Sequence, residues 1–350
     1  MREQRKNEHL QLALQVLDGP EQNGFADIVL IPDAVPELGM DDIDLRSHFL
    51  GKTLACPIMI NAMTGGSGEA KTINRELAAL AARYGLAMAV GSQTVAMEDR
   101  QLADSFIVAR ETNPDGVLIA NVSAGCPAEK ALQAVEMIAA DGLQLHFNLP
   151  QELAMQEGDR NFRGLLDNVG EIVSRCPVPV IAKEVGFGLS RESVVKIHAR
   201  GVHFFDCGGK GGTNFMAIED QRGGMFDPSF YHWGIATTAS LAEIAALQLP
   251  IKIIASGGIR SASEAAKAIA LGADMVGISG LFLRILLQEG AAELERKTER
   301  FLYQLQAVFL MSGAATCREM QQKPLLIFDQ TAQWLARRKI DPAQWSERSE

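Results

Sequence analysis

The chain has 350 residues, 47% of them apolar, which is enough for one large α/β domain or two ordinary ones. Charged residues make up 22% of the chain, which argues against a disordered protein. The formal net charge of −10 provides no basic excess to neutralise phosphates, so we expect no nucleic-acid binding, although a local basic cluster can still hold a small anion.

The N-terminal segment and the cysteines indicate a cytoplasmic protein. The segment MREQRKNEH is charged and lacks the apolar core of a signal peptide, and no apolar run is long enough to cross a bilayer. The five cysteines are scattered, odd in number and without CxxC spacing, so we expect reduced thiols and no metal site among them. We expect residues 1–55 to form an N-terminal arm, with a short helix at 8–17 and a connecting segment.

From residue 56 onward, short apolar runs alternate with amphipathic segments. The strand-like runs lie at 57–64, 86–92, 117–124, 143–150, 178–186, 202–209, 251–258 and 275–282, and clear helix-like segments lie at 69–85, 127–142 and 261–272. Strict alternation predicts a parallel sheet covered by helices, and eight units match a (β/α)8 TIM barrel. The alternative is a doubly wound open sheet, which has fewer parallel strands and, in a dinucleotide binder, a GxGxxG turn that MTGGSGEA does not keep.

The barrel is expected to span 56–312 and to end in one long helix at 284–312. A C-terminal helical tail, 313–350, is expected to pack on the barrel. The loop at 209–234, after the sixth strand, is unusually long. Such loops are typical of lids and binding segments.

The fourth strand carries a polar side. In GLQLHFNLPQE the leucines and Phe147 share one face, while Gln144, His146 and Asn148 share the other. In a barrel we expect the apolar face to pack on helices and His146 and Asn148 to point inward near the open end. The turn at Pro150 then brings Gln151 and Glu152 to the same mouth. Gln144 lies deeper, and we expect it to be a hydrogen-bonded residue without a role in chemistry.

The loops after the last two strands are rich in glycine. ASGGIRSAS follows the seventh strand and GISG ends the eighth. Backbone N–H groups at such turns, with the start of a helix, can hold a phosphate, and this position is a recurrent phosphate site in barrels. The alternative is that these glycines only form tight turns.

Lys183 is predicted to point into the barrel from the fifth strand. A charge in an apolar interior needs an anionic partner. The electron-rich edge of a flavin ring would serve, but a structural carboxylate is the alternative, and a Schiff-base lysine is a further one. In the N-terminal segment, Arg5 and Lys6 are either a solvated arm or a clamp for an anion.

Together these residues resemble the type 2, FMN-dependent isopentenyl-diphosphate delta-isomerases, and the resemblance covers nearly the whole chain. Its most specific parts are His146-x-Asn148-x-x-Gln151-Glu152 and GKGGTNF at 209–215. Other parts are Arg5-Lys6-x-Glu8-His9, Ala62 to Gly66, Gly91-Ser92-Gln93, Asn121 with Ser123, Lys183-Glu184-x-Gly186, Trp233-Gly234 and ASGGIR. One departure is Ala236, where we expect a proline, which should change helix entry and leave the chemistry intact.

The resemblance implies an isomerase of isoprenoid biosynthesis that interconverts isopentenyl and dimethylallyl diphosphate. Reduced FMN would serve proton addition at C4 and removal at C2, with NADPH as the reductant and Mg²⁺ on the diphosphate. It also implies a homo-oligomer, a tetramer or octamer. The implied catalytic residues are Gln151, His146 and Glu152, with Glu152 also binding the metal. The implied substrate-binding residues are Arg5, Lys6, His9, Ser92, His146, Asn148 and Gln151. The implied flavin-binding residues are Ala62, Met63, Thr64, Ser92, Asn121, Lys183, Gly208, Thr213, Gly257, Gly258, Ile259, Gly280 and Leu281.

Other functions are weighed against this one. An FMN barrel oxidoreductase acting on a small anionic substrate, such as a 2-hydroxy acid, needs a histidine base with an arginine in a late loop, and GGKGGTNF and ASGGIRSAS contain no histidine. A purine-nucleotide dehydrogenase needs a cysteine in the loop after the sixth strand, and Cys207 falls one or two residues early. A non-catalytic flavin or diphosphate sensor would not need the polar group on the fourth strand.

Overall fold

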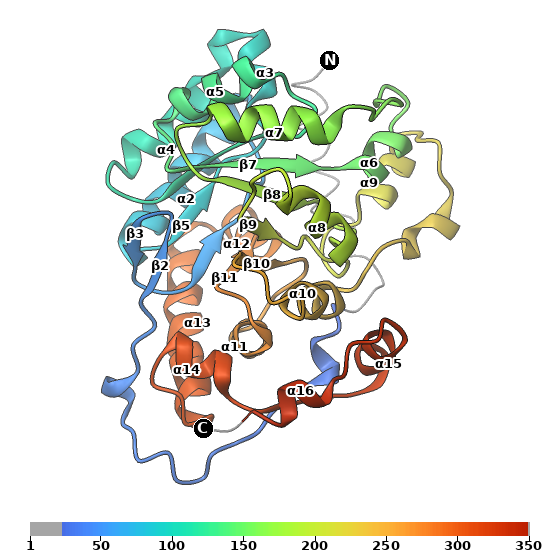
Figure 1. Ribbon diagram of the computed structural model, residues 1–350. Helices are drawn as coiled ribbons and strands as arrows, with labels where there is room; N and C mark the ends of the chain where they lie inside the picture. The colour runs from blue at the N-terminus through green and yellow to red at the C-terminus, as the bar shows by residue number, and fades with distance from the viewer. Residues whose placement is uncertain (1–22, 349–350) are drawn as a thin grey trace.

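The computed structural model describes residues 23–348 and shows a closed, all-parallel barrel of eight strands (Figure 1). The strand order around the barrel is β4-β5-β6-β7-β8-β9-β10-β11, closing back onto β4. The strands are β4 (Ile58–Ile60), β5 (Ala87–Ala89), β6 (Leu118–Ser123), β7 (Gly142–Phe147), β8 (Val180–Glu184), β9 (Phe204–Asp206), β10 (Lys252–Ser256) and β11 (Met275–Ile278). Seven lie inside one predicted run each, and β7 begins one residue before its run of 143–150, so the (β/α)8 prediction is confirmed.

Helices cover the outside of the barrel. The longer ones are α2 (Gly68–Tyr84), α4 (Asp104–Thr112), α5 (Ala128–Met137), α7 (Leu165–Arg175), α8 (Arg191–His198), α10 (Thr237–Ala245), α11 (Ala262–Leu271), α12 (Gly280–Glu289) and α13 (Ala291–Met311). The shorter ones are α3 (Thr94–Glu98), α6 (Leu149–Ala154), α9 (Phe215–Gln221), η3 (Arg100–Leu102) and η4 (Pro228–His232). Helix α11 begins at a capping box in which Ser261 accepts from the Glu264 N–H, and it ends at Gly272, as predicted.

The barrel has an apolar core on each side of its sheet. The outer core joins strand residues such as Leu143 and Leu145 to the helices. The inner core contains Ile119 and Ile181 and is closed at the amino-terminal end by a hairpin of β2 (Ser47–Phe49) and β3 (Lys52–Leu54). Because this end is plugged with apolar side chains, a site for a polar ligand is confined to the carboxyl ends of the strands.

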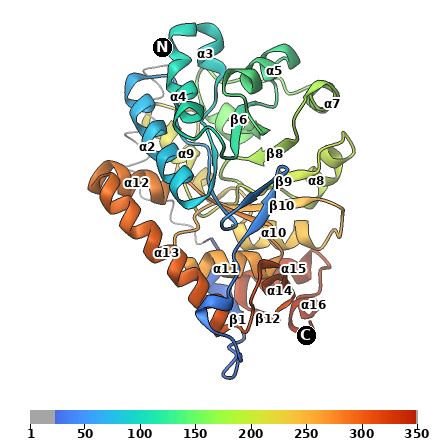
Figure 2. The same cartoon turned by 90° about the vertical axis from the view of Figure 1, so that its left-hand side faces the viewer.

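The segment 284–312 is not one helix. Helix α12 ends at Glu289, and α13 starts at Ala291 in a new direction (Figure 2). Gly290 between them has a φ of +90°, a backbone conformation that a helix cannot continue through and that glycine adopts readily. Helix α12 also begins earlier than predicted, at Gly280, two residues after the last barrel strand.

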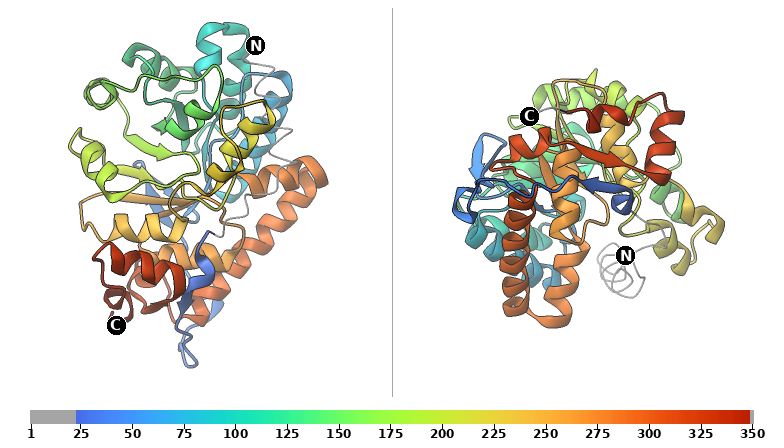
Figure 3. Two further views of the ribbon diagram at one scale, coloured as in Figure 1. Left: turned by 90° about the vertical axis from the view of Figure 1, so that its right-hand side faces the viewer. Right: turned by 90° about the horizontal axis from the view of Figure 1, so that it is seen from below.

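The C-terminal part is less purely helical than predicted. It consists of α14 (Cys317–Gln322), β12 (Leu325–Ile327), α15 (Asp329–Arg337) and α16 (Ala343–Ser346). Strand β12 pairs antiparallel with β1 (Ile28–Leu30), which follows η1 (Phe25–Asp27) and precedes η2 (Met40–Asp42). The right panel of Figure 3 shows this blue strand beside the red one, so segments from both ends of the described chain meet. The helix expected at 8–17 lies outside the described residues.

Ala236, where we expect a proline from the family pattern, stands at the N-cap of α10 with a φ of −57°. A proline ring enforces a φ near −65°, so the backbone is already shaped for proline there. We therefore expect Ala236→Pro to stabilise the protein by about 0.4–1 kcal/mol, because proline restricts the unfolded chain. The melting temperature should rise by about 1–3 °C with activity unchanged. A lower melting temperature would show that the segment before α10 cannot accept the ring.

Candidate active site

A cavity of about 580 Å³ opens at the carboxyl ends of the barrel strands. Every predicted site residue that falls within 23–348 lines it. These are Ala62, Met63, Thr64, Ser92, Asn121, His146, Asn148, Gln151, Glu152, Lys183, Gly208, Thr213, Gly257, Gly258, Ile259, Gly280 and Leu281. Arg5, Lys6 and His9 lie outside the described residues. The cavity is within the range of about 300–1,000 Å³ found for small-molecule and cofactor sites.

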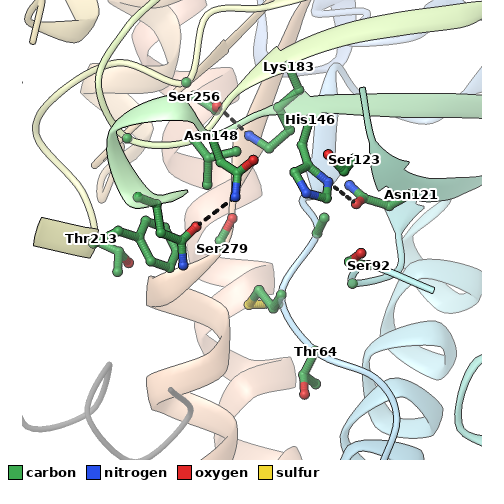
Figure 4. A pocket seen from close by; sticks show the side chains of 18 of the residues that line it. Thr64, Ser92, Asn121, Ser123, His146, Asn148, Lys183, Thr213, Ser256 and Ser279 are labelled. Carbon is green, nitrogen blue, oxygen red and sulfur yellow. Dashed lines mark hydrogen bonds between the residues drawn. The ribbon is translucent and has the colours of Figure 1, made fainter. Parts of the chain in front are cut away.

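Lys183 points into the barrel, and it has a carboxylate partner that the sequence reading did not name. Its Nζ lies 3.0 Å from Oδ2 of Asp206 and 3.4 Å from Oγ of Ser256, and the lysine is visible at the top of the cavity in Figure 4. Asp206 is fully buried. Lys183 is therefore paired with a structural carboxylate, which was one of the alternatives predicted for it. A Schiff base requires a neutral amine as the nucleophile, and an ammonium group in an ion pair is not one. Lys183 also faces the cavity, so it remains able to contact a ligand there.

The fourth barrel strand has the orientation predicted for it. Leu143 and Leu145 are fully buried in the outer core, whereas His146 and Asn148 line the cavity. The strand ends at Phe147, and helix α6 starts at Leu149 with Asn148 as its N-cap and Pro150 in its first turn. The helix carries Gln151 and Glu152 at the mouth.

Two hydrogen bonds fix the carboxylate of Glu152. Asn148 Nδ2 donates to Oε1 at 2.9 Å, and the Asp159 N–H donates to Oε2 at 2.9 Å. The neighbouring Gln151 donates from Nε2 to Oε1 of Glu219 at 3.1 Å, which leaves its own carbonyl oxygen 3.3 Å from Asn148 Nδ2. These bonds hold the polar groups of α6 in fixed orientations beside the cavity.

Glycines let the loops after β9 and β10 pack backbone against backbone. A Cβ on Gly257 would come within 2.1 Å of the Gly209 carbonyl oxygen, and one on Gly258 would meet that of Gly211 at 1.9 Å. Side chains are therefore excluded from this part of the cavity wall, and main-chain groups form it. Arg260 crosses the same loops, donating to the Gly258 carbonyl at 2.8 Å.

The adjacent helix α12 begins at Gly280 without a side-chain hydrogen bond at its N-cap. The first N–H groups of a helix have no partner within the helix and attract anions. Arg284, one turn into α12, lies with its guanidinium near Gly280 and also lines the cavity. The glycine loops, the uncapped helix start and two arginines together fit a phosphate group at this end of the cavity.

Three curated relatives match almost the whole chain. The isopentenyl-diphosphate delta-isomerase of Moorella thermoacetica is 47% identical over 338 residues, which is 97% of each chain. Those of Symbiobacterium thermophilum and Staphylococcus aureus strain JH9 are 45% and 42% identical, covering 100% and 97% of this chain. The sequence model of the FMN-dependent dehydrogenases also matches residues 154–326.

This chain belongs to the type 2 isopentenyl-diphosphate delta-isomerase family.

Solved structures share the barrel of this isomerase at much lower sequence identity. A lactate oxidase of Pediococcus acidilactici matches with a TM-score of 0.69 and 19% identity over 93% of each chain. A flavocytochrome b2 matches with a TM-score of 0.67 and 16% identity over 94% of this chain and 84% of its own. These likenesses show a shared fold.

In the part of the chain that the structure describes, the cavity of this isomerase family member lacks the residues that the two alternative enzymes, a 2-hydroxy-acid oxidoreductase and a purine-nucleotide dehydrogenase, are expected to use in their late loops. Among residues 23–348, the histidine that lines it is His146, on β7, and not a residue of the loop after β10. Cys207 is fully buried, burial raises the pKa of its thiol to about 12, and its Sγ donates to the Ser256 carbonyl oxygen at 3.4 Å. A buried, protonated thiol is a poor nucleophile, so the cysteine that a purine-nucleotide dehydrogenase needs is not supplied here.

Several polar residues beside the isomerase site were missed from the sequence. Asn61 follows β4 and Asp206 ends β9, and both are fully buried with their side chains joined by a 2.6 Å hydrogen bond. Glu219, on α9, is also buried and contacts Gln151. The 209–234 segment was predicted to be a long loop of the kind that forms lids and binding segments. It contains α9 and η4, and α9 brings Glu219 into contact with Gln151 on α6. Strand alternation could have revealed Asn61 and Asp206. Each lies two residues after a side chain of the inner core, Met59 or Phe204, and therefore points to the inside of the barrel as well.

Proposed function

We propose that this protein interconverts isopentenyl and dimethylallyl diphosphate with FMN bound in the cavity. The observation that carries the proposal is the meeting of two unlike groups in one cavity. One is a wall of glycine main chain and arginines at the start of α12, and the other is a cluster of His146, Asn148, Gln151 and Glu152. The first suits the phosphate of a flavin nucleotide, and the second suits a diphosphate and a reacting allylic chain. The family membership of the chain supports this assignment.

Moving the double bond requires a proton at C4 of isopentenyl diphosphate and the loss of one from C2. When bound and reduced, FMN supplies an electron-rich ring whose N5 can hold that proton and stabilise positive charge on the hydrocarbon. Ala62, Met63, Thr64, Ser92 and Asn121 would form the wall that positions the ring. Lys183 would face its anionic edge.

The substrate would be held by the polar residues of β7 and α6. His146, Asn148 and Gln151 would bind the diphosphate and orient the chain over the ring, with Arg5, Lys6 and His9 from the N-terminal segment completing the anion site. The rest of the pocket would exclude water, which keeps a developing cation from being trapped.

Glu152 would bind Mg²⁺ together with the diphosphate. Within residues 23–348 no three His, Cys, Asp or Glu side chains form a metal cluster, so a single carboxylate needs substrate oxygens to complete the shell. Mg²⁺ commonly binds in this way, through one or two carboxylates, waters and phosphate oxygens. The donor set fits a metal that arrives with the substrate.

The resemblance also leads us to propose NADPH as the reductant, a cytoplasmic location and a homo-oligomer of four or eight subunits. No helix within residues 23–348 has the length and apolar character needed to cross a membrane. Trp233 and Met225, in the segment after β9, are 62% and 66% exposed, and large exposed apolar side chains of this kind are common at subunit contacts.

The proposal predicts a flavin spectrum in the purified protein and isomerisation only when the flavin is reduced and Mg²⁺ is present. A product assay with and without dithionite or NADPH, and with and without EDTA, tests this directly. Turnover with oxidised flavin and no reductant would contradict it. Anaerobic bleaching of the flavin by a 2-hydroxy acid would instead favour an FMN oxidoreductase acting on a small anionic substrate.

A further inference from the structure

A chain of three side-chain amides crosses the barrel interior below the cavity and joins Asp206 to His146. Asn61 Nδ2 donates to Asp206 Oδ2 at 2.6 Å, and Gln144 Nε2 donates to Asn61 Oδ1 at 3.0 Å. Asn121 Nδ2 then donates to Gln144 Oε1 at 3.0 Å, and Asn121 Oδ1 lies 2.9 Å from His146 Nδ1 (Figure 4). Asn61 and Gln144 are fully buried, so water does not compete for these bonds.

The direction of the chain is fixed at its Asp206 end. The carboxylate is paired with Lys183 and only accepts hydrogen bonds, so Asn61 must turn its NH₂ toward it. The carbonyl oxygen of Asn61 also accepts the N–H of Ala62 at 2.9 Å, which can only donate. If the Asn61 amide were flipped, its oxygen would face the Asp206 carboxylate and its NH₂ would face the N–H of Ala62, and both contacts would be repulsive. Each amide then orients the next, because an amide that donates at one end must accept at the other.

We infer that Gln144 is a positioning residue, and that this chain holds His146 in the tautomer protonated on Nδ1. Asn121 presents its oxygen to the ring, so Nδ1 must donate, and in the neutral ring the lone pair is on Nε2. This tautomer makes Nε2 the ring atom that accepts a proton or a hydrogen bond. Gln144 is hydrogen-bonded as expected from the sequence, and the proposed positioning role goes beyond the expectation that it has no role in chemistry. The effect on turnover rests on the proposed function, whereas the tautomer does not.

The tautomer can be read by NMR of protein labelled with ¹⁵N in its histidine rings, at a pH where the rings are neutral. His146→Asn identifies the His146 signals by their loss. We expect wild-type His146 to be protonated on Nδ1. In Gln144→Met, a substitution of similar volume, Asn121 Nδ2 loses its acceptor and the amide is free to flip. The ring should then populate both tautomers, and kcat should fall about 10- to 100-fold, as for other supporting hydrogen bonds of a site, with KM changing less.

Two variants control for packing. The carboxylic acid introduced by Gln144→Glu offers an acceptor oxygen to Asn121 and, protonated in this buried place, an O–H to Asn61. It should restore the Nδ1–H form and most of kcat. Ile119→Val removes a methylene from the same barrel interior without touching the amides, and it should change neither tautomer nor kcat.

A wild-type His146 protonated on Nε2 would overturn the inference, and this measurement needs no variant besides the His146→Asn used for assignment. An unchanged tautomer in Gln144→Met would overturn it as well, as would an equal loss of kcat in Ile119→Val. If the tautomer shifts as expected but the wild-type protein does not isomerise its substrate, the proposed function fails and the positioning role of Gln144 stands.

Discussion

Replacing Lys183 with methionine is expected to lower the free energy of unfolding by about 3–5 kcal/mol and to abolish FMN retention. The carboxylate of Asp206 is fully buried, and its contact with Lys183 at 3.0 Å is the ion pair that compensates its charge. Removing one partner of a buried pair leaves an uncompensated charge, which costs about that much. Urea denaturation measures the first effect, and the flavin absorbance of the purified protein measures the second.

A double variant separates the two effects. In Lys183→Met with Asp206→Asn neither side chain of the pair carries a charge, and the new amide can still accept from Asn61, so most of the lost stability should return. FMN retention should stay lost, because the cation that faces the cavity is gone. Lys252→Met is the matched control: this lysine, at the other end of the barrel, pairs with Asp274 at 2.7 Å but its side chain is 55% exposed. Exposed pairs contribute about 0–1 kcal/mol.

Two outcomes would contradict this account. If Lys183→Met retained stoichiometric FMN, the lysine would not face the flavin. If it were no less stable than Lys252→Met, the pair with Asp206 would not compensate a buried charge.

The arrangement of strands was predictable because strand periodicity and the alternation of strands with helices are local properties of the chain. The same periodicity gave the direction of His146 and Asn148. Alternation also places Asn61 and Asp206 inward, yet it does not say which neighbours they meet. That depends on strand register: Lys183 lies beside Asp206 and Asn121 beside Gln144 because the strands are offset by fixed amounts around the barrel.

Other features depend on contacts that are distant in sequence. The pairing of β1 with β12 joins segments almost 300 residues apart, and no local pattern identifies the partner. The turn at Gly290 could not be predicted because the segments on both sides of it have helical periodicity. Only the positive φ of Gly290 in the structure shows that one helix ends and another begins there. The approach of Glu219 to Gln151 required a helix inside a segment whose glycines and aromatic residues indicated a loop.

The register also explains why the missed residues and the predicted ones form a single structure. The side chains below the cavity run without interruption from Lys183 through Asp206 and the amides to His146. The cation proposed to face the flavin and the histidine proposed to bind the substrate are thus oriented by the same buried carboxylate. A change at Asp206 is therefore expected to affect both ligands, whereas changes on α6 should affect the substrate alone.

Glu152→Gln tests that separation. The substitution keeps the shape and the hydrogen bond from Asn148 but removes the charge that would bind Mg²⁺. We expect kcat/KM to fall at least about 100-fold, more than for loss of a residue that only supports a metal ligand. FMN content should be unchanged, because the phosphate wall and Lys183 are untouched. The measurement is kcat/KM over a MgCl₂ titration, with the flavin spectrum recorded for each sample.

The neighbouring Glu157 provides the control for this change. It also lines the cavity, but it pairs with Arg222 at 3.2 Å and its side chain is 50% exposed. Glu157→Gln should leave both kcat/KM and its Mg²⁺ dependence nearly unchanged, since a half-exposed pair contributes little. If the dependence on Mg²⁺ instead survived in Glu152→Gln and disappeared in Glu157→Gln, the metal and the diphosphate would bind beside Glu157, beyond the end of α6. Both carboxylates line the cavity, at positions five residues apart in the chain. The two MgCl₂ titrations together therefore show which of them lies beside the charged end of the substrate.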